Sequence, residues 1–551
     1  MLLQNDCDKA EALNANFSDI FTKDNNNMPV IDDRVGVGDL LSDASFNVDQ
    51  VYKQLRKLKG KSSSGPDGIP TVFLKNLADS LALPLSIVFN VSYNESKLPD
   101  VWKLADITPI FKKGSSSDVN NYRPISLTCV CSKIMESIIK DHVISFLLQH
   151  KLITKQQHGF LSKHSTCSNL LECINDWTLA LDARNSTDVA YIDFSKAFDS
   201  VVHTKLLLKL KSYGVSGRIF DWIADFLHDR CQRVKVGRSF SSYNNVISGV
   251  PQGSVLGPLL FLLYINDLVD VFGSGLKVKL YADDVKIYIH ISDVTTAACL
   301  QAGLNKLCEW ADVWQLNLSI NKCSVFHIGS YNVCSTYTVN NIVLPDVDHV
   351  TDLGIIFDSR LRFNNQYSNI VAKAHRRAAL ILRCFKSRDP FLLFKAFKTY
   401  VIPILEYCSP VWSPVYLTDI RTIESVQRRF TKKLSGLRDI SYNQRLSYLN
   451  AESLERRRLN QDLATIYKII YGLIDIPVDD FFEYSSEQRT RGNSRKLIKP
   501  LCKLNIRKHS FACRNITSWN NLPDYIVCAS NLSVFKKYLS AFNMTKFLTC
   551  L

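Results

Sequence analysis

The sequence contains sixteen cysteines but no CxxC pair, and no cysteine and histidine cluster has the spacing of a zinc site. The cysteines are scattered over 551 residues, and Cys129 and Cys131 are too close in sequence to indicate a site by themselves. These absences argue against a zinc-binding module and against a small disulfide scaffold. We therefore expect free thiols in a reducing compartment.

Long hydrophobic segments are also missing. The longest apolar run covers residues 255–265, which is too short to cross a lipid bilayer. The chain turns acidic at Asp6, directly after its first apolar residues, which is not the pattern of a signal peptide. We expect a soluble intracellular protein, or part of an intracellular complex, with no membrane partner.

Positive charge dominates the composition. The 67 lysines and arginines exceed the 52 acidic residues, which gives a net charge of +15 and a pI near 9.0. This balance favours a polyanionic partner, nucleic acid before membrane, although a merely soluble basic protein would have the same totals. The length is more than one hydrophobic core needs, and it predicts roughly two to four domains.

Residues 277–290 have the pattern of a β-hairpin with an acidic turn. Apolar and polar side chains alternate on both sides of Asp283 and Asp284, which is the period of a half-buried strand. Aspartate is a poor strand residue but a good turn residue. An ordinary hairpin would have the same pattern, so this stretch alone leaves a structural turn and a functional site equally open.

A second apolar strand, predicted for residues 189–193, ends at Asp193. A carboxylate at the end of a buried strand is costly unless it is paired or holds a metal. If this strand lies beside the hairpin of Asp283 and Asp284, three carboxylates converge and require cations. Oxygen ligands suit Mg²⁺, and two such ions about 4 Å apart are typical of nucleotidyl transfer. Asp199 is expected to cap the following helix.

Basic residues are predicted on a further hairpin, over residues 105–127. It would present Lys112, Lys113 and Arg123 on one side. Three such cations could grip a triphosphate, or they could form an ordinary solvated surface if no catalytic site lies nearby.

The rest of the chain is mainly helical by pattern. A helix predicted over residues 371–386 separates an apolar face from basic residues that include Lys373, Arg376 and Arg377, and it could lie against a nucleic-acid duplex or be an ordinary solvated basic helix. The first 50 residues are acidic and are predicted to be a partly ordered lead-in. The other predicted elements are helices within residues 47–60, 71–103, 130–182 and 202–230, a basic strand over residues 232–241, and a segment rich in glycine and proline over residues 246–262.

Six short sequence blocks follow one another over about 240 residues. They are NYRPISL at 121–127, YIDFSKAFDSV at 191–201, SGVPQGSVLGPLL at 248–260, YADD at 281–284, LNLSINKC at 316–323 and LGIIFD at 353–358. Together they resemble the reverse transcriptases of non-LTR (LINE-type) retrotransposons, and among them the jockey-like elements. The YADD block alone is weak, but six blocks in the family's order are specific.

The resemblance implies a catalytic centre with two metal ions. Asp193, Asp283, Asp284 and the backbone carbonyl of Phe194 would bind two Mg²⁺ ions, for which Mn²⁺ could substitute. Lys322 would protonate the leaving pyrophosphate as a general acid.

The resemblance also implies how substrates are held. Lys112 or Lys113, with Arg123, would hold the triphosphate, while Phe198 would stand under the sugar and exclude a ribose 2′-OH. Gln252 and Gly253 would shape the pocket for the incoming nucleotide and template. The primer and template contacts would be made by Tyr281, Leu353, Gly354, Lys373, Arg376 and Arg377.

The implied fold is an α+β right-hand polymerase, with fingers, a palm that contains an antiparallel sheet, and a helical thumb, followed by a helical basic C-terminal region. The expected divisions are an acidic lead-in (1–46), an N-terminal fingers extension (47–93), the fingers and palm (94–357), the thumb (358–440) and the C-terminal region (441–551).

The function implied by the resemblance is RNA-directed DNA polymerisation from a primer 3′-OH. The partners would be an RNA template, a DNA primer or target and deoxynucleoside triphosphates, in a cytoplasmic ribonucleoprotein and in the nucleus, without an identified targeting signal. The sequence leaves the oligomeric state open. Two alternatives remain: a related polymerase or maturase that makes or handles RNA, and a catalytically idle RNA-binding protein derived from such an element.

Overall fold

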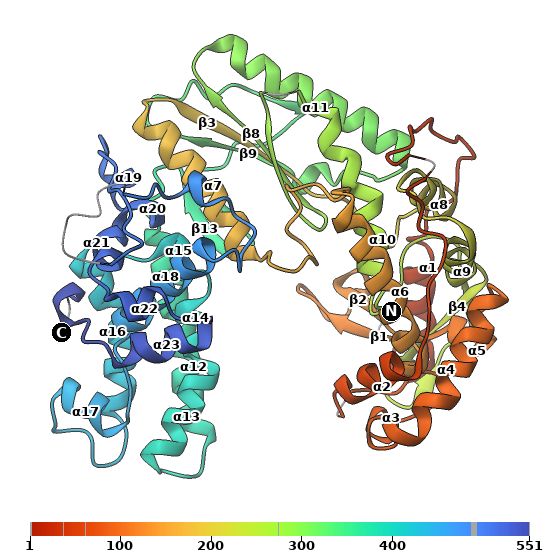
Figure 1. Cartoon of the computed structure of the whole chain (residues 1–551), viewed down its shortest axis with the longest axis horizontal. Coiled ribbons are helices and arrows are strands. Elements are labelled where there is room, and N and C mark those ends of the chain that lie inside the picture. Colours follow the sequence, from red (N-terminus) through yellow and green to blue (C-terminus); the bar gives the residue numbers. More distant parts are fainter. Residues whose placement is uncertain (1–2, 37, 61, 274, 486–492, 550–551) are drawn as a thin grey trace.

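A central sheet joins two largely helical bodies, one N-terminal and one C-terminal (Figure 1). This computed structural model describes residues 3–36, 38–60, 62–273, 275–485 and 493–549. Within those ranges, no helix is both long enough and apolar enough to pass through a membrane. The mixture of helix and sheet confirms the predicted α+β class.

The central sheet is antiparallel throughout and has the strand order β7-β8-β3-β9. The middle strand β3 pairs along its length with β8 on one side and β9 on the other. The four strands are β3 (Ser186–Ile192), β7 (Lys277–Tyr281), β8 (Asp284–Ile291) and β9 (Ser324–Ile328).

Both faces of this sheet are covered, because successive side chains of a strand point to opposite faces. Ala190 and Ile287 belong to the core that includes residues of helix α11 (Val294–Trp314). Val189 and Tyr288 belong to a second core with helix α7 (Thr166–Asp182), where the Trp177 ring meets Tyr288 edge-on at 6.0 Å. Burial on both faces fixes the register, since a slip by one residue would exchange the two sets of side chains.

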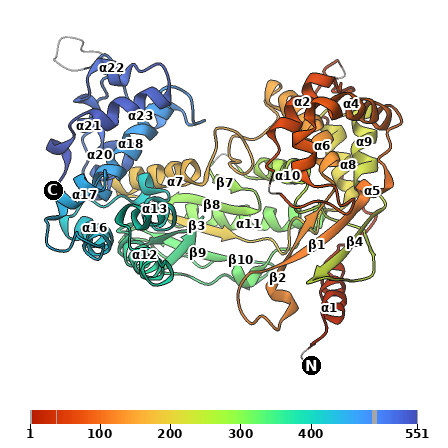
Figure 2. The same cartoon turned by 90° about the horizontal axis from the view of Figure 1, so that it is seen from below.

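A second sheet lies in the N-terminal body (Figure 2) and has the order β2-β1-β4-β5, with β6 also paired to β4. Strand β1 pairs with β2 in antiparallel and with β4 in parallel orientation. The strands are β1 (Leu104–Phe111), β2 (Tyr122–Leu127), β4 (Arg230–Val236), β5 (Ser239–Phe240) and β6 (Asn244–Val246). The helices of this body are α1 (Asp6–Ser18), α2 (Val48–Lys57), α3 (Thr71–Asn76), α4 (Ala78–Asn94), α5 (Asp100–Lys103), α6 (Val130–Gln149), α8 (His203–Ser212), α9 (Gly217–Leu227) and α10 (Gly257–Ile265).

The C-terminal body is helical and follows two small hairpins, β10 (Thr338–Val339) with β11 (Ile342–Val343), and β12 (His349–Asp352) with β13 (Ile355–Asp358). Its helices are α12 (Asn364–Cys384), α13 (Pro390–Tyr400), α14 (Ile402–Glu406), α15 (Ser409–Trp412), α16 (Leu417–Lys432), α17 (Tyr442–Tyr448), α18 (Leu454–Ile470), α19 (Asn505–Lys508), α20 (Phe511–Arg514), α21 (Ile516–Asn520), α22 (Asp524–Val527) and α23 (Leu532–Ala541).

The predicted hairpins over residues 105–127 and 277–290 are confirmed, and so is the amphipathic helix within residues 371–386. Two predictions were wrong in detail. Residues 232–241 form two short strands rather than one, because Gly237 adopts a left-handed φ of 59° at a turn. Residues 150–165 form no α-helix within the stretch predicted as helical, and this loop becomes important below.

The acidic lead-in contains helix α1. Ala10, Leu13 and Phe17 of α1 form a small core with Ile107 of β1 and Val234 of β4. This helix therefore covers one face of the second sheet.

We expect Phe17→Ala to destabilise the protein by about 3 kcal/mol, because Phe17 is only 2% exposed and its removal leaves a cavity against β1 and β4. Chemical denaturation would measure the change. The exposed Asp8→Asn on the same helix is the control and should leave stability unchanged. Equal stability of the two variants would contradict the packing role of α1.

Candidate active site

The turn between β7 and β8 carries Asp283 and Asp284. Tyr281 pairs with Asp284 across the turn, and Ala282 between them has a left-handed φ of 56°. A left-handed alanine is uncommon and needs support from its surroundings. The backbone of this turn is therefore constrained, and the constraint holds Asp283 and Asp284 in fixed positions.

Asp193 follows the last residue of β3, and the register of the sheet brings it to the same end. Ile192 is opposite Val285, the residue that follows Asp284. The predicted adjacency of the two strands is confirmed. Asp193 also lies beside a loop from another direction, because Ser319 N–H donates to the Asp193 carbonyl at 2.8 Å.

The carboxylates of this end influence one another. Burial and the negative charges of Asp283, Asp352 and Asp193 together raise the pKa of Asp284 to about 6. Burial and the charge of Asp193 also raise the pKa of Asp283, against the opposing charges of Arg123 and Lys112. Asp352, at the end of β12, is a contributor that the sequence patterns did not indicate.

That Asp193, Asp283 and Asp284 together hold metal stays a prediction. Among the residues that the structure describes, no three aspartate, glutamate, histidine or cysteine side chains are grouped closely enough to hold a metal ion. Asp193 instead forms an ion pair with Lys322, Nζ to Oδ1 at 2.9 Å. Since like charges repel, the Asp193 carboxylate turns toward the ammonium group rather than toward its acidic neighbours.

The donor set nevertheless suits Mg²⁺ in its chemistry. All three side chains offer oxygen, and the charges that raise the pKa of Asp283 and Asp284 would be relieved by a divalent cation. Phe194, whose carbonyl was predicted as a further ligand, follows Asp193 and is buried at 3% exposure.

The basic hairpin of β1 and β2 faces these acids. Lys112 N–H donates to Asn121 O at 2.8 Å and closes the hairpin, while Arg123 lies opposite Ile110. Burial lowers the pKa of Lys112, and so do the charges of Arg123, Lys322 and Lys113. The predicted cations therefore gather in one place, and their fields reach Asp283 and Asp193.

Phe198 occupies a cluster of aromatic rings. Its ring stacks on Phe261 of α10, with centroids 4.2 Å apart, and meets Phe160 edge-on at 6.1 Å. Its position is further fixed by Val250 N–H, which donates to the Phe198 carbonyl at 2.8 Å. A ring held from both sides can act as a rigid steric barrier.

Gly253 lies against strand β2. It has a φ of 128°, and a Cβ at this position would come within 2.4 Å of the Ser126 carbonyl oxygen. The neighbouring Gln252 carbonyl accepts from Ser126 N–H at 2.8 Å. Only a glycine at position 253 therefore allows this segment to lie so close to the backbone of β2.

Asp199 is not the predicted helix cap. Helix α8 begins after Val202, and no side chain caps it. Both carboxylate oxygens of Asp199 instead accept from Gln252 Nε2 at 2.9 Å. Burial raises the pKa of Asp199 to about 6. Asp199 therefore holds the side chain of a predicted nucleotide-pocket residue.

The predicted primer-grip residues form the turn of the β12–β13 hairpin. Leu353 and Gly354 have φ values of 44° and 86°. The Tyr407 hydroxyl donates to the Leu353 carbonyl at 2.8 Å and so links this turn to the C-terminal body. Tyr281, also predicted to contact primer, is half-buried at the end of β7.

Lys373, Arg376 and Arg377 are exposed on α12, a helix of the C-terminal body (Figure 1). Burial lowers the pKa of His375 on the same helix, and so do the charges of Arg429 in α16 and of Lys433 directly after it. The basic faces of α12 and α16 therefore adjoin.

We predict that the free energy of unfolding of the parent protein falls relative to that of Asp199→Asn as the pH rises from about 4 to about 6. The folded protein holds the Asp199 proton more tightly than the unfolded chain does, so the parent loses stability as pH passes from the unfolded pKa to the folded value near 6. Urea unfolding at pH 4.5 and 7.5 measures the difference. A stability difference between the two proteins that is the same at both pH values would refute the raised pKa.

Comparison with known proteins points to one family for the part of the chain that contains this site. A family model described as reverse transcriptase (RNA-dependent DNA polymerase) matches residues 110–357. That range includes the three aspartates, the basic hairpin, Lys322 and the Leu353–Gly354 turn.

Similar whole proteins come from fruit flies. The chain is 27% identical over 408 residues to a probable RNA-directed DNA polymerase from transposon X-element of Drosophila melanogaster. It is 28% identical over 401 residues to the RNA-directed DNA polymerase from mobile element jockey of Drosophila funebris, and 28% identical over 412 residues to a probable RNA-directed DNA polymerase from transposon BS of Drosophila melanogaster. Each match covers 71% of this chain and 44% of the relative, so the chain spans less than half the length of these proteins.

Proposed function

We propose that this chain is an RNA-directed DNA polymerase of a non-LTR retrotransposon, because residues 110–357 match the family model of reverse transcriptases. It would copy retrotransposon RNA into DNA from a primer 3′-OH. The observation that carries the proposal is the arrangement of Asp193 beside the Asp283–Asp284 turn, with the basic hairpin of Lys112 and Arg123 facing them.

In this proposal the parts of the structure take the roles of a right-hand polymerase. The second sheet and its helices are the fingers, the central sheet is the palm, and α12 to α16 form the thumb, where Lys373, Arg376 and Arg377 would contact the phosphate backbone. Tyr281 and the Leu353–Gly354 turn would hold the primer.

Asp193, Asp283, Asp284 and the Phe194 carbonyl would hold two Mg²⁺ ions, or Mn²⁺ in their place. When bound, such ions neutralise charge on the attacking and leaving oxygens. Lys322, whose Nζ lies 2.9 Å from Asp193 Oδ1, would donate a proton to the leaving pyrophosphate.

The substrate side of the site follows from its cations and aromatic rings. Lys112 and Lys113 would bind the triphosphate as compact positive charges, and the planar Arg123 guanidinium would donate hydrogen bonds to its oxygens. Gln252, oriented by Asp199, and Gly253 would shape the pocket of the base pair. The partners are then an RNA template, a DNA primer and deoxynucleoside triphosphates, and we propose a cytoplasmic ribonucleoprotein and the nucleus as the places of action.

Asp283→Asn should lower kcat for primer extension on an RNA template by about 10³-fold or more, equivalent to about 4 kcal/mol. The change removes one anionic ligand but leaves the fold and the affinity for template. Primer extension and filter binding with the same RNA measure both quantities. The exposed Asp312→Asn serves as control; normal polymerisation by Asp283→Asn would disprove the assignment.

Phe198→Ala should raise the use of ribonucleotides relative to deoxynucleotides by about tenfold or more. The Phe198 ring, braced by Phe261, would otherwise collide with a ribose 2′-OH. Competitive incorporation of matched ribo- and deoxynucleotides measures the ratio. Phe160→Ala removes only the edge contact and leaves the Phe198 ring stacked on Phe261, so it should change the ratio less than Phe198→Ala does. An unchanged ratio in Phe198→Ala would end the steric-gate proposal.

A further inference from the structure

The loop between α6 and α7 runs alongside β7 and reaches the acidic turn. Leu280 N–H donates to the Gln156 carbonyl at 2.9 Å, and His158 N–H donates to the Leu280 carbonyl at 2.9 Å. These two bonds attach residues 156–158 to β7 like a short parallel strand, with Gln157 bridged to Leu280. The loop therefore has a fixed backbone position at the residues just before the turn.

The Gln157 side chain makes the contact to the turn itself. It is only 1% exposed, and its Oε1 accepts from Ala282 N–H at 2.9 Å and from Gly159 N–H at 2.7 Å. Ala282 is the residue with the left-handed backbone that leads into Asp283. A buried N–H at such a residue needs an acceptor, and the Gln157 amide oxygen supplies it.

Gly159 completes the contact from the other side of the loop. A Cβ at Gly159 would stand 2.4 Å from the Ala282 nitrogen and 3.1 Å from its Cα. Only glycine allows the loop to lie this close to the turn. Gln157 and Gly159 together leave Ala282 little room to move.

We propose that Gln157 is a positioning residue for the reaction: through the Ala282 N–H it fixes the turn on which Asp283 and Asp284 stand. This inference rests on the proposed polymerase function. Gln157 does not touch the carboxylates, so its effect passes through the backbone of Ala282. Losing the acceptor would release the left-handed turn and move both aspartates.

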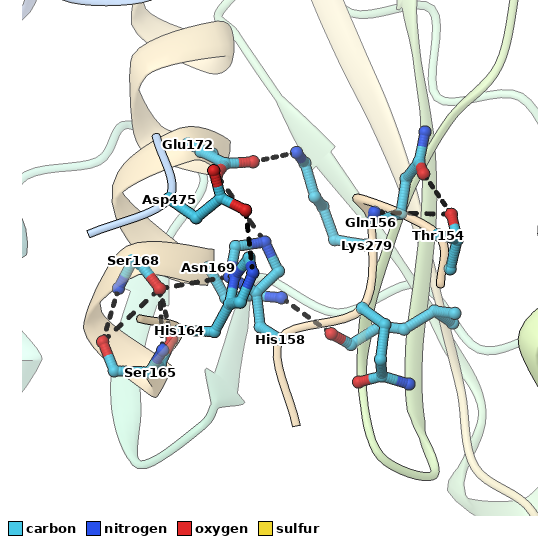
Figure 3. Close-up of polar contacts among 12 residues, drawn as sticks. Thr154, Gln156, His158, His164, Ser165, Ser168, Asn169, Glu172, Lys279 and Asp475 are labelled. Carbon is cyan, nitrogen blue, oxygen red and sulfur yellow. Dashed lines mark hydrogen bonds and ion pairs between the residues drawn. The ribbon is translucent and has the colours of Figure 1, made fainter. Parts of the chain in front are cut away.

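A polar network holds the loop in place on its far side (Figure 3). The buried His158 ring contacts Ser168 Oγ at 3.1 Å and His164 Nδ1 at 3.3 Å, and lies 3.6 Å from Glu172. Glu172 in turn pairs with Lys279 of β7.

The same network reaches the C-terminal body. His164 Nε2 lies 3.4 Å from Asp475, and Asp475 N–H donates to the Lys163 carbonyl at 3.1 Å. The position of Gln157 is therefore set by α7, by β7 and by the segment after α18, independently of its own side chain. A change of the Gln157 side chain should remove the contact to Ala282 without displacing the loop.

The test compares Gln157→Met, Gln157→Glu and Gln156→Met in the full chain. Methionine has a similar length but no acceptor for the Ala282 N–H. Glutamic acid keeps the acceptor in its protonated form, which burial and the nearby Asp283 and Asp284 favour. Its second oxygen replaces Gln157 Nε2, which has no hydrogen-bond partner among the described residues. Gln156 is the matched control, because its side chain bonds to Thr154 and only its backbone carbonyl meets β7.

We expect Gln157→Met to lower kcat by about tenfold or more, which corresponds to about 1.4 kcal/mol, with KM for primer–template unchanged. Mn²⁺ binding to the free protein, measured by titration calorimetry, should weaken in parallel. Gln157→Glu and Gln156→Met should behave like the parent in both measurements. Damage from Gln157→Glu equal to that from Gln157→Met would overturn the proposal, and so would a Gln157→Met that matches Gln156→Met.

Gly159→Ala is a second variant in case Gln157→Met does not fold, as judged by circular dichroism. Its methyl group pushes directly on Ala282, so kcat and Mn²⁺ binding should fall as in Gln157→Met; parent-like values would count against a fixed turn. If the parent chain itself does not polymerise, the proposed function fails, and the Mn²⁺ titrations alone decide the role of Gln157.

Discussion

Repulsion among carboxylates at one end of the central sheet is the constraint on which the rest of the site depends. Asp193, Asp283 and Asp284 come from two adjacent strands, and the charge of Asp193 raises the pKa of both Asp283 and Asp284. Crowded negative charge is stable in a folded protein only when cations balance it. Here the balance comes from Lys322 in a loop and from Lys112 with its basic neighbours on a hairpin of the other sheet.

This balance explains why the two sheets must lie together. The β1–β2 hairpin belongs to the N-terminal body, yet the charges of its residues Lys112 and Arg123 act on Asp283 in the central sheet. Residues of the segment that is rich in glycine join the two, because Gly253 approaches Ser126 of β2 while Gly249 N–H donates to the Val201 carbonyl that follows β3. The site is therefore a product of contacts between sheets as much as of either sheet.

The strands of the site could be predicted because their patterns are local. Alternation on both sides of Asp283 and Asp284 defined the hairpin, and an apolar run defined the strand before Asp193. Their adjacency remained conditional, since pairing between segments 90 residues apart in sequence does not follow from periodicity. The orientation of the Asp193 carboxylate toward Lys322 was beyond prediction, because it depends on a loop that approaches from outside the pair of strands.

The residues that sequence reasoning missed share one property, which is that they act on backbone or on other side chains through buried hydrogen bonds. Gln157 lay in a stretch predicted to be helical, and its only signal was the break that Gly159 makes in the apolar periodicity. Asp199 stood before a helix and was predicted to cap it, whereas its carboxylate holds Gln252. Such partners are distant in sequence, so no spacing indicates them.

The hydrogen bonds of Gln157 and Asp199 act in the same way. In each, a buried polar side chain from one segment holds a group on which a predicted catalytic or binding residue depends: Ala282 N–H before Asp283, and the Gln252 amide beside the predicted nucleotide pocket. A buried polar group without a partner is costly, so each bond is strongly favoured once the segments pack. The acidic and basic side chains supply the charge of the site. Gln157 and Asp199 fix the positions of the groups next to these charged side chains.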